Sequence, residues 1–373
     1  MNPIFHVPTR KSLHKLKPYT PGKPIWEVQQ ETGLSNIIKL ASNENPLGPS
    51  PKALEAAAAS LSELHRYPDA GTVRLRQALA LHHQLNPDNF IISNGGDELI
   101  VLLAQTFLDP DNEVIVCTPS FSEYEFGSLL MGASVVQVPL PPTFAFHVES
   151  ILAAVTERTR LICLCSPNNP TGTYLSRAEL QLILDSLPKH VLFLLDAAYS
   201  GFASAPDYTN GVEFVRAGYP LIVLQTFSKL YGLAGLRVGY GIAHETFIQD
   251  IVKVKEPFNV NALAQAAATA ALGDKAHVQL TTEANHEGRQ QLYQAFQQLG
   301  LSYTESMGNF VLVKIGDNAK QVYEALLAQG IIVRFGGGWN LPEYLRISVG
   351  LPEENADFIR ALSSIMAESS ATR

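Results

Sequence analysis

Short apolar runs alternate with amphipathic stretches between residues 90 and 242. The apolar runs are rich in Val, Ile, Leu and Phe, as buried strands are, whereas the stretches between them carry apolar residues at helical spacing. This alternation predicts βαβ units that build a mostly parallel sheet. The predicted strands are 90–93, 113–117, 134–138, 161–165, 191–196, 221–226 and 238–242, and the predicted helices between them are 97–107, 122–131, 150–154 and 177–186, with Ser176 as an N-cap.

The pattern changes after residue 261. An Ala-rich stretch at 263–272 is followed by a polar helical stretch at 278–299, which is long enough for roughly six turns. Beyond it the chain predicts strands near 310–315, 331–335 and 345–349 and helices at 319–329 and 353–367. We therefore expect an α/β protein whose large domain, residues 45–273, holds a seven-stranded mostly parallel sheet. A smaller α+β domain at 274–373 and an amino-terminal arm at 1–44, part of which joins the small domain, complete the predicted organisation.

Composition narrows the class of protein. The 373 residues exceed the usual size of one domain, and 46% hydrophobic with 17% charged residues is ordinary for a globular chain. The net charge of -8 gives no basic surface for nucleic acid or a membrane, and the apolar runs are too short to cross a bilayer. We expect a small-molecule partner and, without an apolar leader, a cytoplasmic location. Neither the histidines nor the three cysteines, which we interpret as buried thiols, have the spacing of a metal site.

A lysine at the end of a predicted strand is the first candidate for chemistry. Lys229 follows the apolar run 221–226, and a lysine in a pocket loses its proton readily enough to attack an aldehyde. Thr226, Ser228 and Arg237 would supply hydroxyl and guanidinium donors to a phosphate. Alone, such a lysine would usually be a solvated surface residue.

Another predicted strand ends in a carboxylate. Asp196 closes the run 191–196, and Tyr199 follows three residues later. A buried charge needs a partner, and a protonated pyridine nitrogen would be one. An N-cap role for Asp196 on a following helix is the alternative.

Two loops at predicted strand ends could position a ligand. Two prolines and a glycine make the loop at 166–172 rigid, which would fix Asn168, although it could equally be a turn without a ligand. Gly95, Gly96 and Asp97 open a predicted helix whose first amides could receive an anion, although the same residues make an ordinary turn.

Three further residues are candidates for ligand contacts. Phe121 lies past a strand end and could stack on a flat ring, or simply pack in the core. Arg334 and Arg346 lie on or beside apolar strands, where an anionic substrate or an internal glutamate would be the natural partner. The run 336–338 is three glycines and is interpreted as a flexible loop.

In order and together, these segments resemble the fold-type I pyridoxal-phosphate-dependent aminotransferases, and within them the members that act on histidinol phosphate. The resemblance rests on the motifs at 16–22, 39–48, 67–69, 166–172, 226–237 and 346–350, which span about nine tenths of the chain. It implies pyridoxal 5'-phosphate as cofactor, a homodimer with shared active sites, and transfer of an amino group from a small-molecule donor to a keto acceptor, in histidine biosynthesis.

The resemblance also implies individual roles. Lys229 would hold the cofactor as a Schiff base, Asp196 would pair with the pyridine nitrogen, and Asn168 and Tyr199 would bond the ring oxygen. Tyr67 would reach the phosphate in the neighbouring subunit. The other implied contacts are stacking by Phe121, phosphate binding by Gly95, Gly96, Ser228 and Arg237, further cofactor contacts by Asp97 and Thr226, and substrate binding by Tyr19, Asn43, Arg334 and Arg346, with a cis peptide bond between Asn169 and Pro170.

Two departures from the family pattern leave the substrate open. Ala197 stands where the family usually has glutamate, and Gly96 replaces the commoner serine or alanine. An aromatic amino acid aminotransferase or a threonine-phosphate decarboxylase would keep the same cofactor residues. A non-catalytic regulator would need a DNA-binding module, and the roughly 40 residues before Asn43 carry no such pattern.

Overall fold

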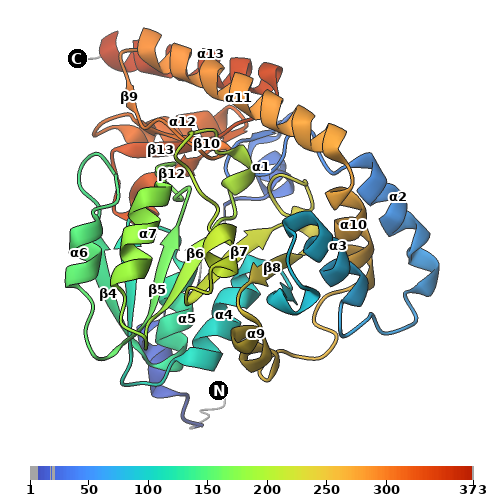
Figure 1. Ribbon diagram of the computed structural model, residues 1–373. Helices are drawn as coiled ribbons and strands as arrows, with labels where there is room; N and C mark the ends of the chain where they lie inside the picture. The colour runs from blue at the N-terminus through green and yellow to red at the C-terminus, as the bar shows by residue number, and fades with distance from the viewer. Residues whose placement is uncertain (1–6, 17, 19–21, 372–373) are drawn as a thin grey trace.

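The computed structural model describes residues 7–16, 18 and 22–371. Its centre is a seven-stranded sheet with the order β2-β8-β7-β6-β5-β3-β4, in which β8 alone runs antiparallel to its neighbours (Figure 1). The predicted mostly parallel sheet is confirmed, and each strand lies within two residues of its predicted bounds. The strands are β2 (Phe90–Ser93), β3 (Glu113–Thr118), β4 (Ser134–Pro139), β5 (Thr159–Cys165), β6 (Leu192–Asp196), β7 (Leu221–Thr226) and β8 (Gly239–Ile242).

Both faces of this sheet are buried. Along β3, Val114 and Val116 belong to one core cluster, whereas Ile115 and Cys117 belong to the other. Because side chains alternate across a strand, a run that is apolar at every position buries both faces. The strand ends that follow such runs therefore lie between two helical layers, out of bulk water.

Helices cover the two faces in two groups. The cluster that contains Ile115 includes residues of α2 (Pro51–Ala59), α3 (Val73–His83), α6 (Val148–Ala153), α7 (Arg177–Ser186), α8 (Val212–Arg216) and α10 (Ala262–Leu272). The cluster that contains Val114 includes residues of α4 (Gly96–Phe107), α5 (Glu123–Met131) and α9 (Glu245–Val252). Ser176 caps α7 reciprocally with Glu179, as the sequence predicts.

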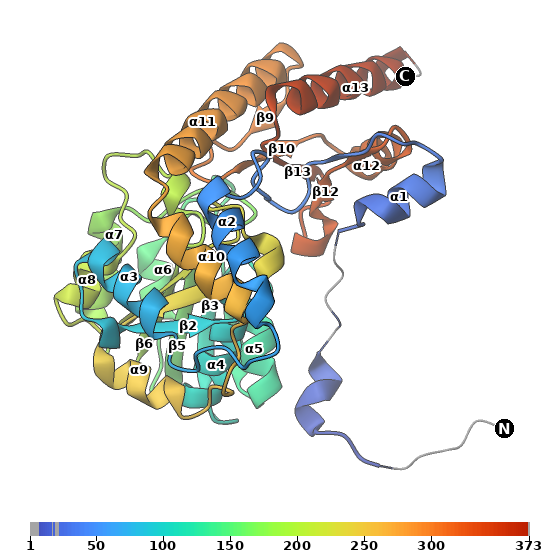
Figure 2. The ribbon, with the colours of Figure 1, turned by 90° about the vertical axis from the view of Figure 1, so that its right-hand side faces the viewer.

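A second, smaller sheet packed with helices lies at one end of the molecule (Figure 2). Its antiparallel sheet has the order β12-β13-β10-β9 and shares a core with the long helix α11 and with α12 and α13. β1, near the amino terminus, pairs in parallel with β11 and adds Ile38 to that core, and Leu40, just after β1, belongs to it as well. The elements are α1 (Ile25–Thr32), β1 (Ile38–Lys39), α11 (Lys275–Gln298), β9 (Ser302–Tyr303), β10 (Phe310–Lys314), α12 (Ala319–Ala328), β11 (Ile331–Ile332), β12 (Arg334–Phe335), β13 (Tyr344–Ser348) and α13 (Pro352–Ala371).

The structure corrects the sequence in two neighbouring places. The single strand predicted at 331–335 is two short strands in different sheets, β11 and β12, separated by the buried Val333. The run interpreted as a flexible glycine loop is a 3-10 helix, η6. The short 3-10 helices are η1 (Lys11–Lys15), η2 (Leu61–Glu63), η3 (Pro87–Asn89), η4 (Ser200–Phe202), η5 (Ala234–Leu236) and η6 (Gly336–Trp339).

Across the described residues, no helix combines the length and the apolar character needed to cross a membrane.

Candidate active site

A cavity of about 1090 Å³ lies at the carboxyl ends of the central strands. The adjacent parallel strands β5, β6 and β7 each contribute their last residue, Cys165, Asp196 and Thr226, to its wall. Carboxyl ends of parallel strands are where α/β proteins bind ligands. Residues predicted as site residues make up much of the lining, namely Asn43, Gly96, Asp97, Phe121, Asp196, Tyr199, Thr226, Ser228, Lys229, Arg237, Arg334 and Arg346.

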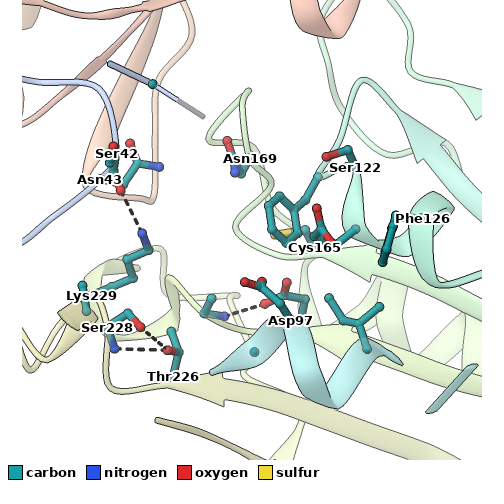
Figure 3. Close-up of a pocket in the computed structure, with 18 of the residues that line it drawn as sticks. Ser42, Asn43, Asp97, Ser122, Phe126, Cys165, Asn169, Thr226, Ser228 and Lys229 are labelled. Atoms are coloured by element: carbon teal, nitrogen blue, oxygen red, sulfur yellow. Dashed lines mark hydrogen bonds between the residues drawn. The ribbon is translucent and has the colours of Figure 1, made fainter. Parts of the chain in front are cut away.

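Lys229 points into this cavity from the loop after β7 (Figure 3). Its Nζ donates a hydrogen bond of 2.9 Å to the carbonyl of Ser42 and lies 5.8 Å from the centre of the Tyr199 ring. Burial lowers the pKa of the Lys229 amine to about 8, and the positive charge of Arg346 adds to this effect. At pH 7 about one amine in ten is therefore neutral and nucleophilic, whereas an ordinary lysine would be neutral in fewer than about one molecule in a thousand.

Asp196 is a buried carboxylate, 4% exposed, at the end of β6. Its Oδ2 accepts a hydrogen bond of 2.6 Å from the Tyr124 hydroxyl, and its Oδ1 accepts one of 3.0 Å from the Ala198 amide. Burial raises the pKa of Asp196 to about 6, while these two hydrogen bonds oppose the rise. Ala198 lies in a turn, so Asp196 caps this turn and does not act as the N-cap of a helix.

Tyr199 and Asn43 join the two halves of the cavity wall. The hydroxyl of the buried Tyr199 accepts a hydrogen bond of 3.0 Å from Nδ2 of Asn43. Asn43 has a positive φ of 53°, and Ser348 on β13 bonds both its amide and its Oδ1 at 2.8 Å. Asn309 donates to the Asn43 carbonyl at 3.0 Å. Asn43 thus connects the central sheet to the carboxyl-terminal sheet.

One side of the cavity is built to receive an anion. Arg237 donates to Oδ2 of Asp97 and to the carbonyl of Ala234, both at 3.2 Å. A side chain at Gly95 would overlap the Arg237 guanidinium, so only glycine, at its φ of +83°, allows this approach. Gly96 opens α4, whose first amides have no partners within the helix.

Two hydroxyls complete this side of the cavity. The Thr226 hydroxyl donates to that of Ser228 at 2.9 Å, and the Ser228 amide donates back to the Thr226 oxygen at 3.1 Å (Figure 3). The two side chains are therefore held next to Lys229. Together with Arg237 they form the set of donors that the sequence predicts for a phosphate.

Asn168 does not face the cavity, contrary to the sequence interpretation. Its side chain is fully buried, accepts a hydrogen bond from Ser120 at 2.7 Å, and donates to Pro119 and Thr171 at 3.0 and 2.8 Å. Its neighbour Asn169 lines the cavity instead. In this turn the two successive side chains therefore point in different directions, Asn168 into the protein and Asn169 to the cavity.

The loop that carries these asparagines has the predicted cis bond between Asn169 and Pro170. Cis bonds also precede Pro119 and Pro167.

Arg334 and Arg346 converge on the opposite side of the cavity. They are cross-strand neighbours on β12 and β13. Arg346 is 5% exposed, and its guanidinium donates to Oδ1 of Asn169 and to the carbonyl of Ala41. Both arginines are thus presented to the cavity by one sheet.

The remaining predicted residues lie in different places. Phe121 lines the cavity and contacts the Tyr124 ring edge-to-face at 5.8 Å. Tyr67 is 82% exposed, lies outside the cavity of its own chain, and stacks on Phe258 at 4.7 Å. Tyr19 lies outside the described residues.

Sequence reasoning missed three groups of the site. They are Asn169, the Tyr124 hydroxyl and the Ser42 carbonyl. Tyr124 could have been suspected because it lies in the first turn of the helix that follows the predicted strand end at Phe121. A backbone carbonyl leaves no signal in the sequence.

The model of the family described as "Aminotransferase class I and II" matches residues 35–362. A histidinol-phosphate aminotransferase of Moorella thermoacetica is 47% identical over 98% of this chain and 95% of its own, and one of Akkermansia muciniphila is 45% identical over 94% and 97%. The crystal structure of histidinol-phosphate aminotransferase from Sinorhizobium meliloti in complex with pyridoxal-5'-phosphate superimposes with a TM-score of 0.90 at 27% identity, over 98% of this chain and 99% of that one. The chain therefore belongs to the aminotransferase class I and II family.

Proposed function

We propose that the chain is a pyridoxal-phosphate-dependent transaminase that converts histidinol phosphate and 2-oxoglutarate into imidazole-acetol phosphate and glutamate. The observation that carries the proposal is the buried Lys229 amine, whose pKa is lowered to about 8, in one cavity with the buried carboxylate of Asp196. The names of the relatives that match almost the whole chain support the same substrate.

The residues present fit pyridoxal 5'-phosphate. A dianionic phosphate suits the side with Arg237, the hydroxyls of Thr226 and Ser228, and the first amides of α4. Gly95 leaves the space that Arg237 occupies, which a Cβ would fill. A carboxylate that is costly to bury alone, Asp196, is the partner that a protonated pyridine nitrogen requires.

When bound, this cofactor supplies an electron sink that stabilises negative charge on the substrate carbon. Lys229 would hold the cofactor and, when its amine is free, would move a proton as a base with a pKa near the working pH. Asp196 would stabilise a positive charge at the ring nitrogen. Tyr199 and Asn169, which takes the place first assigned to Asn168, would offer hydrogen-bonding groups to the ring oxygen, and Phe121 would pack against the ring.

The substrate anion is assigned to the other side of the cavity. Arg334 and Arg346 bind the phosphate of one substrate and the carboxylate of the other, because a planar guanidinium accepts both kinds of anion in fork geometry. Asn43 orients Tyr199 and closes the wall beside the substrate. Tyr19 is proposed as a further substrate contact on the basis of the family resemblance.

The enzyme is proposed to act in the cytoplasm as a homodimer with shared active sites. Tyr67 stands 82% exposed, near three leucines that are more than half exposed, Leu54, Leu61 and Leu64. Several exposed large apolar side chains in one stretch of chain support an interface between subunits there. Tyr67 would then contact the cofactor phosphate of the partner. The division at residues 44 and 273 would let the carboxyl-terminal domain move against this dimer.

Half-reaction rates test the substrate assignment. The purified protein, loaded with cofactor, is mixed in turn with histidinol phosphate, phenylalanine and threonine phosphate, and the change in cofactor absorbance is followed. Histidinol phosphate is expected to react fastest and glutamate to react in the same assay. Faster reaction with phenylalanine would favour an aromatic aminotransferase, and release of carbon dioxide from threonine phosphate a decarboxylase. No reaction with any amine would favour a regulator.

A further inference from the structure

Arg334 and Arg346 stand directly opposite each other on β12 and β13. Directly opposite residues of an antiparallel pair have their Cβ atoms about 5 Å apart, and like charges at such positions destabilise the sheet. The separation and direction of the two guanidiniums decide how they meet an anion. A group that contacts both of them would therefore control how the cavity recognises its substrate.

Trp339 is such a group. The centre of its ring lies 5.9 Å from Cζ of Arg334 and 5.1 Å from Cζ of Arg346, and the residue lines the cavity. The face of an indole ring attracts cations, and it does so without cancelling their charge. A carboxylate in the same place would hold the guanidiniums together but would also remove the positive potential that draws in an anion.

The backbone around Trp339 fixes the ring in this position. A Cβ on Gly336 would overlap the Leu341 carbonyl and approach that of Tyr344 to 2.8 Å, so glycine is required for the fold-back of η6. The helix closes with hydrogen bonds of 3.1 Å from the Leu341 amide to the Gly336 carbonyl and 3.2 Å from the Asn340 amide to the Gly337 carbonyl. The glycine run therefore builds a platform for Trp339 and is not a flexible link.

We propose that Trp339 is a positioning residue that holds the guanidiniums of Arg334 and Arg346 as one receptor for a phosphate dianion. It thereby favours amines that carry a phosphate over amines that carry a carboxylate. The inference rests on the proposed function and names the group that sets its substrate preference. A dianion gains from two guanidiniums aligned at once, whereas a carboxylate monoanion gains less from the second.

Steady-state kinetics of Trp339→Leu and Trp339→Phe holoenzymes test the role of the ring. Trp339→Leu is expected to raise the KM for histidinol phosphate about tenfold, which corresponds to the loss of one partly desolvated cation–π contact. Because a phenyl ring keeps part of this contact, Trp339→Phe should raise the KM no more than about threefold. The kcat should stay within about twofold and the KM for glutamate should rise less than that for histidinol phosphate. Trp26→Leu is the matched control, because Trp26 is 64% exposed on α1 and lies outside the cavity.

Three results would overturn the proposal. They are an unchanged KM in Trp339→Leu, equal losses in the leucine and phenylalanine variants, and a loss in kcat alone.

A second measurement leaves Trp339 intact, so it does not depend on the folding of a variant at that position. The chain has two tryptophans, and in a Trp26→Phe holoenzyme the remaining emission comes from Trp339. Titration with inorganic phosphate should change this emission with a midpoint equal to its inhibition constant against histidinol phosphate. Constant emission at phosphate concentrations that inhibit turnover would refute the proposal while leaving the transaminase assignment intact. A saturable change in a protein that reacts with no amine would instead support the receptor and refute the proposed activity.

Discussion

The cofactor side and the substrate-anion side of the cavity are built differently. Asp196 and Lys229 follow buried parallel strands, and the partners of Asp196, Tyr124 and Ala198, lie on elements of the same central sheet and its helices. Arg346 instead reaches from the carboxyl-terminal sheet to Asn169 on the central side and to Ala41 next to β1. Apart from the contacts of Lys229 and Tyr199 with Ser42 and Asn43, the side proposed to hold the cofactor is thus built from the central sheet and its helices. The side proposed to bind the substrate anion lies where several sheets and loops meet.

The largest expected effect comes from removing the Lys229 amine on the cofactor side. Lys229→Ala should lower kcat/KM by about ten-thousandfold or more, because no other group can carry the cofactor and move the proton. Borohydride reduction followed by mass spectrometry should then find no cofactor at residue 229. Lys253→Ala, an exposed lysine paired with Asp250, is the matched control and should behave as wild type. Retained transamination in Lys229→Ala would remove the basis of the comparison.

Asp196→Asn should separate catalysis from stability on the same side. The kcat should fall about a hundredfold to a thousandfold, because a neutral amide holds no positive charge at the ring nitrogen. The folded-state pKa of Asp196 is raised to about 6 from 3.8, so the ionised carboxylate costs stability above about pH 6, and this cost fades as the pH falls towards 4.

Melting temperatures of the cofactor-free protein test whether the ionised Asp196 lowers its stability. The Asp196→Asn variant should therefore melt at a higher temperature than wild type at pH 8, with little difference near pH 4. Asp111→Asn, on the surface, serves as the control. A lower melting temperature at pH 8 would show that Asp196 stabilises the empty fold.

Arg346→Lys tests the substrate-anion side of the cavity. Lysine keeps the charge but loses the fork that contacts Asn169, Ala41 and the substrate together, so the KM for both substrates should rise about thirtyfold to a hundredfold. The kcat should change only a few fold, unlike in the Asp196 variant. Arg360→Lys, in an exposed pair with Asp357, is the control. A larger change in kcat than in KM would place Arg346 on the cofactor side.

Adjacent asparagines offer a sharper contrast within one loop. Asn169→Ala should lower kcat/KM about tenfold and change stability less than Asn168→Ala, since its side chain lines the cavity and its hydrogen-bond partner there is the Arg346 guanidinium. Asn168→Ala should lower the free energy of unfolding by about 2 kcal/mol, because it removes the hydrogen bonds to the part-buried Ser120 hydroxyl and Pro119 carbonyl and one of those to Thr171. Chemical denaturation and steady-state kinetics of both variants distinguish the two roles. The reverse outcome would restore the sequence-based choice of Asn168.

The smallest expected effect is on the pH dependence of cofactor capture. Because the pKa of Lys229 is lowered to about 8, the neutral fraction of its amine grows about fivefold between pH 7 and 8 and then levels off. The rate at which cofactor-free protein gains cofactor absorbance should follow this curve. A rate that keeps rising up to pH 10 would indicate an amine with an ordinary lysine pKa.

The two sides also differ in how far the sequence predicts them. Mostly apolar runs predicted the strands of the central sheet, and Lys229 and Asp196 could be found because Asp196 ends such a run and Lys229 follows another by three residues. The short strand β12 has no such run, and its separation from β11 depends on pairing with distant chain segments. Local periodicity cannot report such pairing.

Two segments, the asparagine pair and the glycine run, show why the rest of the site was not predictable. The choice between Asn168 and Asn169 depends on which way the backbone turns at residue 168, and both asparagines satisfy the same motif. The glycines before Trp339 suggested flexibility, whereas steric contacts with Leu341 and Tyr344 make the first of them, Gly336, a requirement of η6. In both cases neighbours in space decide the outcome.

The parallel pairing of Ile38 with Ile331 has a consequence for biosynthesis. On the ribosome, β1 leaves the exit tunnel long before its partner strand exists, and contacts so distant in sequence form late. The carbonyl that accepts the Lys229 hydrogen bond belongs to Ser42, just after β1. A nascent chain that has already completed the central sheet therefore still lacks the strand that holds Ser42 beside the Lys229 amine, and the cavity closes only after residues 331 and 332 have been made.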